Sequence, residues 1–189
     1  MKQQLHNYLN RYVTFSEEEV NLFYNYLTPK TFQKKEYLLK EGDLCKDKFF
    51  ITEGLVRIYK IDLKGKEKIA HFGIENWWTT NMESYILEQP SQLYIQALEN
   101  TSVLSISKTN LEKAFKKLPK LERMFRIITE NMFVAIERKN ELYMKFSGKD
   151  RYQNLVDRIP DFAQRVPQYM IASYLDITPE YLSEIRKNK

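Results

Sequence analysis

Cysteine, long apolar runs and chain-breaking residues are all scarce in this chain of 189 residues. The single cysteine, Cys45, excludes an internal disulfide and any cysteine cluster for zinc or iron–sulfur. The longest apolar run, Met132 to Ile136, covers five residues, whereas a helix that crosses a bilayer needs about 20. The first ten residues lack the apolar core of a signal peptide. We therefore expect a cytoplasmic protein with no membrane partner.

Sequence signatures of catalysis are also missing. The chain has no glycine-rich phosphate loop, no nucleophile elbow and no closely spaced histidine pair. Its two histidines, His6 and His71, lie far apart in the sequence and have no evident catalytic partners nearby. We therefore predict that the protein is not an enzyme and holds no metal or other cofactor.

The composition that is present is that of a folded, slightly basic protein. Hydrophobic residues make up 43% and charged residues 29%, which excludes broad disorder. Lysine and arginine number 30 against 25 acidic residues, a net charge of +5, and the excess lies mainly in residues 101–148. An anionic partner is compatible with this balance, but no arginine block or basic tail identifies one.

Hydrophobic periodicity indicates helices first and strands afterwards. Residues 1–28 follow helical spacing, and Ser16 with Glu19 has the pattern of a capping box. From Thr31 to Ser107 short β-forming runs alternate with turn glycines, which is typical of an antiparallel barrel or sandwich. A short helix is expected within this region, from Met82 to Glu88.

A second helical region runs from Lys108 to about Ser147 and carries an apolar stripe. Its spacing alternates between four and three residues, as in a coiled-coil seam. The seam positions are Leu121, Phe125, Ile128, Met132, Ala135, Lys139, Leu142 and Phe146. The alternative is packing against the β region of the same chain. Because flanking apolar residues such as Phe133 and Ile136 widen the face, we expect one side to pack internally and the other to form a homodimer.

Residues 166–187 have the spacing of a helix-turn-helix. The small residue Ala172 lies in the middle of the first helix, where a second helix must cross closely. Thr178 can cap that second helix, and Leu182 and Ile185 form its inner face. An ordinary helical hairpin is the alternative. The combination of small residue, turn, cap and two spaced apolar residues favours DNA binding.

The order of these pieces resembles the CRP/FNR superfamily of bacterial transcription regulators. Residues 39–43 and 49–59 are similar to the early strands of that family, and residues 96–106 are similar to its last strands. The resemblance implies an α+β fold with an antiparallel, cyclic-nucleotide-binding-like β-roll, a long dimerisation helix and a C-terminal winged helix-turn-helix.

The resemblance also sets the expected organisation and function. The β-roll with its N-terminal helices should span residues 1–118, the dimerisation helix 119–147 and the DNA-binding domain 148–189. The implied function is a DNA-binding transcription regulator that acts as a homodimer on a palindromic site, with RNA polymerase as a further candidate partner. The alternative is a dimeric small-molecule sensor or interaction module whose DNA binding has degenerated.

The predicted recognition helix departs from the family pattern. Glu180 matches an acidic residue that accepts hydrogen bonds from cytosine, whereas Pro179 and Glu184 replace arginines. The full set of candidate DNA-binding residues is Gln168, Thr178, Glu180, Tyr181, Ser183, Glu184, Arg186 and Lys187. Glu184 opposes binding, because its charge repels phosphate, unless it reads a cytosine or pairs with Arg186 or Lys187.

The segment in which family members bind the effector, residues 74–95 and here called the effector cassette, departs from the family pattern as well. Family members that bind cyclic nucleotides neutralise the phosphate with an arginine, but residues 74–95 contain no arginine, lysine or histidine, and Ser91 aligns with that arginine. We therefore expect no control by cyclic AMP. The candidate effector pocket is instead apolar or stacked, with the residues Trp77, Trp78, Tyr85, Ser91 and Gln92.

Overall fold

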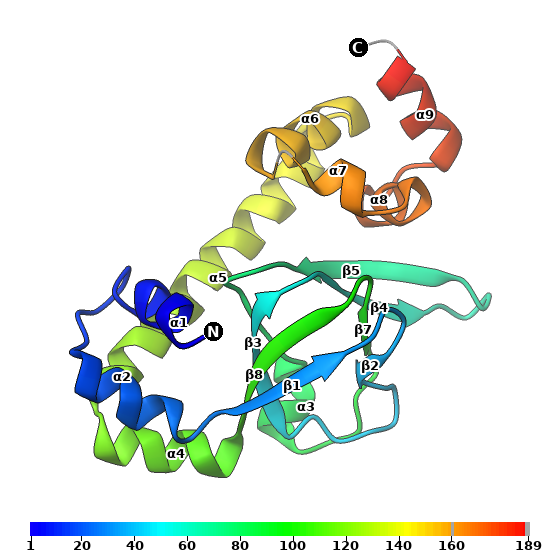
Figure 1. The fold of residues 1–189 in the computed structure, drawn as a ribbon. Coiled ribbons are helices and arrows are strands. Elements are labelled where there is room, and N and C mark those ends of the chain that lie inside the picture. Colours follow the sequence, from blue (N-terminus) through cyan, green and yellow to red (C-terminus); the bar gives the residue numbers. More distant parts are fainter. Residues whose placement is uncertain (160, 188–189) are drawn as a thin grey trace. The chain divides into compact units, whose positions relative to one another are not determined.

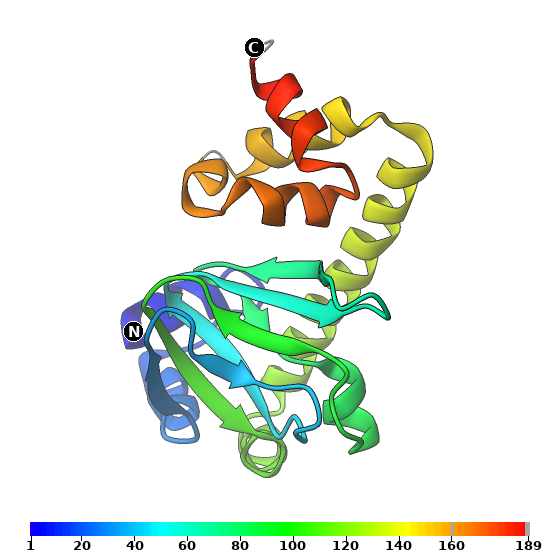
Figure 2. The same cartoon turned by 90° about the vertical axis from the view of Figure 1, so that its right-hand side faces the viewer.

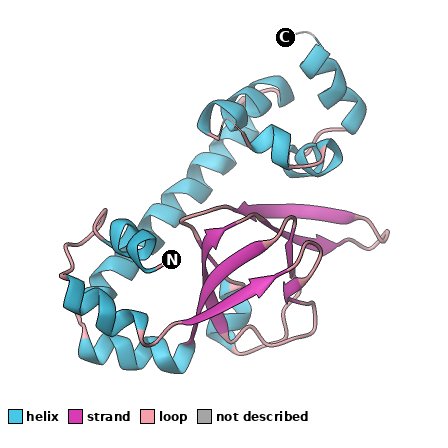
Figure 3. Cartoon of the chain, in the orientation of Figure 1, coloured by secondary structure: helices cyan, strands magenta, loops and turns pink. Residues whose placement is uncertain are grey.

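The computed structural model describes residues 1–159 and 161–187, and these form two compact units. The first unit comprises Met1–Lys60 and His71–Thr129, and the second comprises Ile61–Ala70 and Glu130–Lys189. Figure 1 shows the order of helices and strands, and Figure 3 separates the two kinds of element by colour. The domain bounds expected from sequence stay a prediction, and the last domain includes Pro160, Asn188 and Lys189, which lie outside the described residues.

Two short helices open the first unit, α1 (Lys2–Leu9) and α2 (Glu17–Tyr24). The predicted capping box at the start of α2 is confirmed. The Ser16 hydroxyl accepts a hydrogen bond from the Glu19 backbone N–H, and the Glu19 carboxylate accepts one from the Ser16 N–H at 2.8 Å. These two bonds satisfy backbone donors that the first turn of a helix otherwise leaves free.

The predicted antiparallel strands form a β-roll of two four-stranded sheets, which can be followed in Figure 2. One sheet has the order β1-β8-β3-β6 and the other β2-β7-β4-β5. The strands are β1 (Thr28–Phe32), β2 (Tyr37–Leu39), β3 (Asp47–Glu53), β4 (Val56–Ile61), β5 (Glu67–Gly73), β6 (Trp78–Thr79), β7 (Tyr94–Ala97) and β8 (Thr101–Ser107). The first strand begins before the expected Thr31 and includes Pro29, which is tolerated because β1 is an edge strand.

Strand β3 separates two hydrophobic cores because successive side chains point to opposite faces of a sheet. Phe50 belongs to the core beneath the helices, together with Leu104 of β8. Its neighbours Phe49 and Ile51 belong to the core inside the roll. The alternation fixes which strand positions can face a ligand within the roll and which serve only to hold the helices.

Three further helices complete the description of this half of the chain. The expected helix inside the β region is confirmed as α3 (Met82–Leu87). α4 (Lys108–Lys117) follows β8 directly, and α5 (Lys120–Lys145) is a helix of 26 residues. Leu121, in the first turn of α5, is fully buried in the core beneath the helices, whereas every residue from Glu130 to Arg138 is exposed.

The elements described beyond α5 are all helices. Its elements are α6 (Gly148–Arg158), α7 (Phe162–Arg165), α8 (Gln168–Leu175) and α9 (Pro179–Lys187). The helix pair expected between residues 166 and 187 is present as α8 and α9. No strand occurs in residues 148–159 and 161–187, so the wing of the expected winged helix is not among them. The short α7 was not expected, and it buries Phe162.

Candidate nucleic-acid interface and effector cassette

The α8–α9 pair is held together by small and branched apolar side chains. Ala172 and Ile171 of α8 are fully buried, as is Leu182 of α9, and Ile185 is 6% exposed. Because alanine has a single methyl group, it lets the second helix approach closely. These residues therefore fix α9 on its inner face, as the sequence predicts, and leave its opposite face free.

The turn between α8 and α9 is defined by two local features. Asp176 takes the left-handed conformation with φ of 52° at the end of α8, and the Ile177 N–H returns to the Ala172 carbonyl at 3.0 Å. The Thr178 hydroxyl then accepts a hydrogen bond from the Tyr181 N–H at 3.1 Å. The predicted capping role of Thr178 is confirmed, and it leaves this side chain at the very start of α9.

The outer face of α9 presents most of the candidate DNA-binding residues. An open hollow of about 490 Å³ on this face is lined by Pro179, Glu180, Ser183, Glu184 and Lys187. The exposed candidates are Gln168 at the start of α8 and Thr178, Glu180, Tyr181, Glu184, Arg186 and Lys187, while Ser183 is half-buried.

The charges on α9 are unevenly distributed, and the second acidic residue, Glu184, lies between the two ends. Glu180 lies in the first turn, where the helix dipole stabilises a negative charge, and Arg186 and Lys187 lie in the last turn. Tyr181 is 41% exposed and presents a phenol near the acidic end. Tyr169 on α8 is a further exposed aromatic at 56% that the sequence pattern did not single out. Exposed aromatic rings and cationic ends can contact sugars and phosphates, and carboxylates can accept from cytosine amino groups.

The apolar stripe of α5 divides into a buried and an exposed part. Leu121 is fully buried, and Phe125 packs edge-on against Phe115, so these two positions serve the core of their own chain rather than a seam. Ile128 also packs against that core. Met132 is 43% exposed, and Ala135 is exposed as well. The last seam position, Phe146, is 49% exposed, and the exposed apolar surface widens beyond the predicted seam to include Phe133, Val134, Ile136 and Met144.

Lys139 and Leu142, two further positions of the predicted seam, are only partly exposed. The Lys139 ammonium donates to the Ala70 carbonyl at 3.1 Å and lies 4.1 Å from the centre of the Tyr174 ring. Burial lowers the pKa of Lys139 to about 8, because removal from water disfavours the charged form. Lys139 is therefore engaged with its own chain, through a carbonyl and an aromatic face.

Helix α8 is also joined to the β4–β5 hairpin within the second unit. The Ile69 N–H donates to the Ser173 hydroxyl at 3.1 Å, and that hydroxyl donates to the Glu67 carbonyl at 3.4 Å. The Ser173 hydroxyl thus bonds to one backbone donor and one backbone acceptor of β5. The Tyr143 hydroxyl of α5 donates to the Tyr174 carbonyl, so α5, α8 and the hairpin share one set of contacts.

The five residues predicted to form an effector pocket do not converge on one cavity. Trp78 packs at 5.4 Å from Phe50 and belongs to the core beneath the helices. Tyr85 is 4% exposed and belongs to the core inside the roll. Trp77 is 47% exposed and Gln92 is exposed. Trp77 directly precedes β6 and is 47% exposed, whereas Trp78 is the first residue of β6 and packs into the core.

The cassette between β6 and β7 is closed by its own hydrogen bonds. The Ser91 hydroxyl donates to the Leu93 carbonyl at 2.7 Å and accepts from the Asn81 amide at 2.7 Å and from the Leu93 N–H at 3.0 Å. A hydroxyl has one proton and two lone pairs, so all of its capacity is used internally. Ser84 is used in the same way, by the Gln89 carbonyl and the Cys45 N–H.

One cation beside the cassette was missed because it comes from a distant strand. Lys48 of β3 lies 4.3 Å from the centre of the Tyr85 ring and 3.5 Å from the Met82 sulfur. Burial lowers the pKa of Lys48 to about 8, and the electrostatic attraction of Cys45 acts in the opposite direction by raising it. No pattern within residues 74–95 could have revealed Lys48. Its ammonium is already held by an aromatic face and a thioether.

Other kinds of site find no support in the described part of the chain. Residues 1–159 and 161–187 contain no group of three histidine, cysteine or acidic side chains arranged to hold a metal ion. Within the same residues no helix combines the length and hydrophobicity needed to cross a membrane.

Comparisons with known proteins agree with this geometry. Residues 29–117 match the family model of the cyclic nucleotide-binding domain. The chain is 26% identical over 169 residues to electron transport regulator A of Shewanella oneidensis, a match that covers 82% of this chain and 66% of that protein. It is 26% identical over 187 residues to the fumarate and nitrate reduction regulatory protein of Yersinia pestis, covering 91% and 73%.

The fold is also found in a solved structure, that of FixK2. FixK2 from Bradyrhizobium japonicum superposes with a TM-score of 0.73 at 20% identity, over 86% of this chain and 83% of that one. The curated relatives are regulatory proteins rather than enzymes. The β-roll, the long helix and the helix-turn-helix occur here in the order that the sequence resemblance implies, and the chain therefore belongs to the CRP/FNR superfamily of transcription regulators.

Proposed function

We propose that this protein is a DNA-binding transcription regulator that acts as a homodimer on a palindromic site and is not controlled by cyclic AMP. The observation that carries the proposal is the seating of α9. Its apolar residues Leu182 and Ile185 are buried, and its polar residues face outward around an open hollow. A recognition helix needs this arrangement, because the inner face must hold it rigidly while the outer face reaches base edges.

The exposed part of the α5 stripe supports dimerisation. Met132, Phe133 and Ile136 are 43%, 60% and 40% exposed within one and a half turns of a helix. A contiguous apolar surface of this kind marks an interaction site in a soluble protein. A second copy of α5 would cover it with the same residues, as a two-fold interface requires. Two recognition helices would then read half-sites about 34 Å apart.

The closed cassette supports independence from cyclic nucleotides. A cyclic phosphate is an anion, and its burial without a cationic partner is strongly unfavourable. The cation found beside the cassette, Lys48, is already held by the Tyr85 ring and the Met82 sulfur. Ser91 stands where the family arginine is expected, and its hydroxyl is fully used by Asn81 and Leu93. Titration calorimetry with cyclic AMP and cyclic GMP should give no binding heat. Micromolar affinity for either nucleotide would contradict this part of the proposal.

Selection from randomised duplexes tests DNA binding directly. We expect an enriched palindrome, and its affinity should fall steeply with salt because phosphate contacts release counterions. Lys187→Gln should weaken all sequences alike and reduce the salt dependence, whereas Glu180→Ala should change base preference at one position of each half-site by ~1–3 kcal/mol. Lys34→Gln removes an exposed lysine from the first unit and serves as the matched control.

The second candidate function is a dimeric sensor or interaction module with degenerate DNA binding. The observation that favours it is the exposed Glu184, which lines the hollow on α9. A carboxylate at this position repels the DNA phosphates unless it accepts a hydrogen bond from a base. Failure to enrich any palindrome, together with a stable dimer in solution, would favour this function over the first.

A further inference from the structure

A cavity of about 250 Å³ opens between the edge strands of the two sheets of the roll. β1 is the outermost strand of one sheet and β2 of the other, and the segment that leads into β3 completes the wall. The lining residues are Lys30, Phe32, Leu38, Leu39, Leu44, Cys45, Lys46, Asp47 and Phe49. None of them belongs to residues 74–95, so the lining differs from the segment in which the family arginine is expected.

The floor of the cavity is apolar. Leu39, Cys45 and Phe49 are 6%, 5% and 4% exposed and belong to the core inside the roll. Leu44, at the opening, leaves 46% of its surface exposed. An apolar floor with an open mouth is the usual form of a small-molecule pocket, and its volume lies just below the ~300–1,000 Å³ of drug-sized ligands. The cavity therefore suits a body of about one ring.

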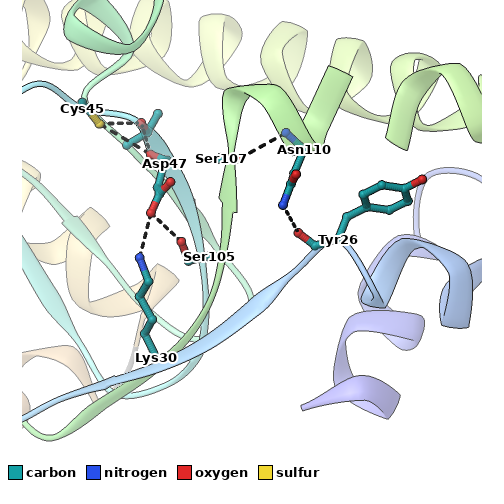
Figure 4. Close-up of polar contacts among 8 residues, drawn as sticks. Tyr26, Lys30, Cys45, Asp47, Ser105, Ser107 and Asn110 are labelled. Atoms are coloured by element: carbon teal, nitrogen blue, oxygen red, sulfur yellow. Dashed lines mark hydrogen bonds and ion pairs between the residues drawn. The ribbon is translucent and has the colours of Figure 1, made fainter. Parts of the chain in front are cut away.

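The polar wall carries a net positive charge. One Asp47 carboxylate oxygen accepts from the Lys30 ammonium at 2.8 Å and from the Ser105 hydroxyl at 2.7 Å (Figure 4). Asp47 is thus neutralised within the wall. Lys46 is exposed at the mouth and makes no ion pair with any described residue. Two lysines against one paired aspartate leave an excess of one positive charge at the opening.

We propose that this cavity binds a small aromatic carboxylic acid. The ring would lie over Leu39 and Phe49, where an offset or edge-on contact with the Phe49 ring is favourable. The carboxylate would remain at the mouth, within reach of Lys46 and of the Lys30 protons that Asp47 does not use. The proposal concerns ligand binding by the first unit and holds whether or not α9 binds DNA.

Titration calorimetry of the full chain with three probes of similar shape tests the charge preference. Benzoate, benzyl alcohol and benzylamine present an anionic, a neutral and a cationic group on the same ring. We expect benzoate to bind at least fivefold more tightly than benzyl alcohol, and benzylamine to give no heat. Lys46→Gln should remove most of the preference for benzoate, and Lys34→Gln should leave it unchanged.

The single cysteine reports where the probe binds. Because Cys45 lines the cavity and is the only thiol in the chain, bound benzoate should slow its reaction with methyl methanethiosulfonate. Leu38→Trp fills the mouth and should abolish binding, whereas Leu63→Trp, at a fully exposed position of the β4–β5 hairpin, should not. Equal affinity for the three probes, binding without protection of Cys45, or no binding at millimolar concentration would each overturn the proposal.

Discussion

Removal of the Leu182 side chain should destabilise the packing of the recognition helix α9 and, with it, DNA binding in urea. Leu182 is fully buried, and the helix that carries it, α9, packs against α8 and α6. Leu182→Ala deletes three carbons, which at ~0.8 kcal/mol per buried methylene costs about 2.4 kcal/mol of transfer free energy. The cavity left behind raises the loss, and buried leucine-to-alanine changes typically cost ~2–5 kcal/mol in total. We expect about 3 kcal/mol.

A loss of this size is large for the C-terminal helices. Whole domains are stable by only ~5–15 kcal/mol, and small helical units lie at the lower end because they bury little surface. Apparent DNA affinity falls in proportion to the fraction of molecules whose recognition helix is correctly seated. About 2 kcal/mol would remain, enough to keep most molecules folded without denaturant. Leu182→Ala should therefore lower the urea concentration at which binding to every duplex is lost, without any change in base preference.

Urea unfolding followed by circular dichroism gives the stability, and fluorescence anisotropy with a labelled duplex gives the affinity. Leu63→Ala is the matched control, since it removes the same three carbons from a fully exposed position. Such surface changes usually alter stability by less than ~0.5 kcal/mol. If Leu182→Ala unfolds at the same urea concentration as Leu63→Ala, the seating argument for α9 is refuted.

Three further predictions concern the dimer, the buried lysine and the acidic position of α9. Met132→Asp should give monomers in analytical ultracentrifugation because it places a charge in the exposed stripe, whereas Leu121→Ala should lower stability and leave the dimer intact; the opposite pattern would contradict the proposed interface. Folded Lys139 loses its proton near pH 8 while the unfolded chain keeps it to about 10.5, so the free energy of unfolding should rise with pH across that interval. Lys139→Met should flatten that rise in urea unfolding, and an unchanged slope would argue against burial as its cause. Glu184→Arg should tighten binding to all duplexes if Glu184 opposes phosphate, and relaxed base preference at equal affinity in the same anisotropy assay would show that it reads a base.

The element order could be predicted from sequence because local signals agree with tertiary packing. The capping box at Ser16, the small Ala172 and the cap at Thr178 each act through neighbours in the chain, and all three occur as expected. The four-residue α7 could not be foreseen, because a single turn is too short to establish a periodicity.

The apolar stripe of α5 shows where sequence reasoning stops. The spacing from Leu121 to Met132 is continuous, yet the former is fully buried and the latter exposed. Periodicity identifies a face of a helix but not what covers it. The division depends on where α5 leaves the core beneath the helices, and that is set by α1, α2 and α4, which are distant in the sequence.

The effector cassette was only partly predictable for a related reason. The missing arginine is visible in the sequence, and the internal use of Ser91 is consistent with its absence. The opposite placement of Trp78 and Tyr85 depends on strand alternation and on the turn into α3, which the irregular sequence between residues 74 and 95 does not define. Lys48 enters only because β3 and α3 lie side by side in the fold.

The contacts of Ser173 with the β4–β5 hairpin bear on how such regulators can be recombined. The compact unit that contains α9 also includes Ile61–Ala70, a segment inserted in the middle of the roll sequence. A chimera that joins the roll of one relative to the helices of another at residue 130 would therefore pair Ser173 and Lys139 with a foreign hairpin. A functional exchange should need two crossovers rather than one, so that the hairpin and the helices are inherited together.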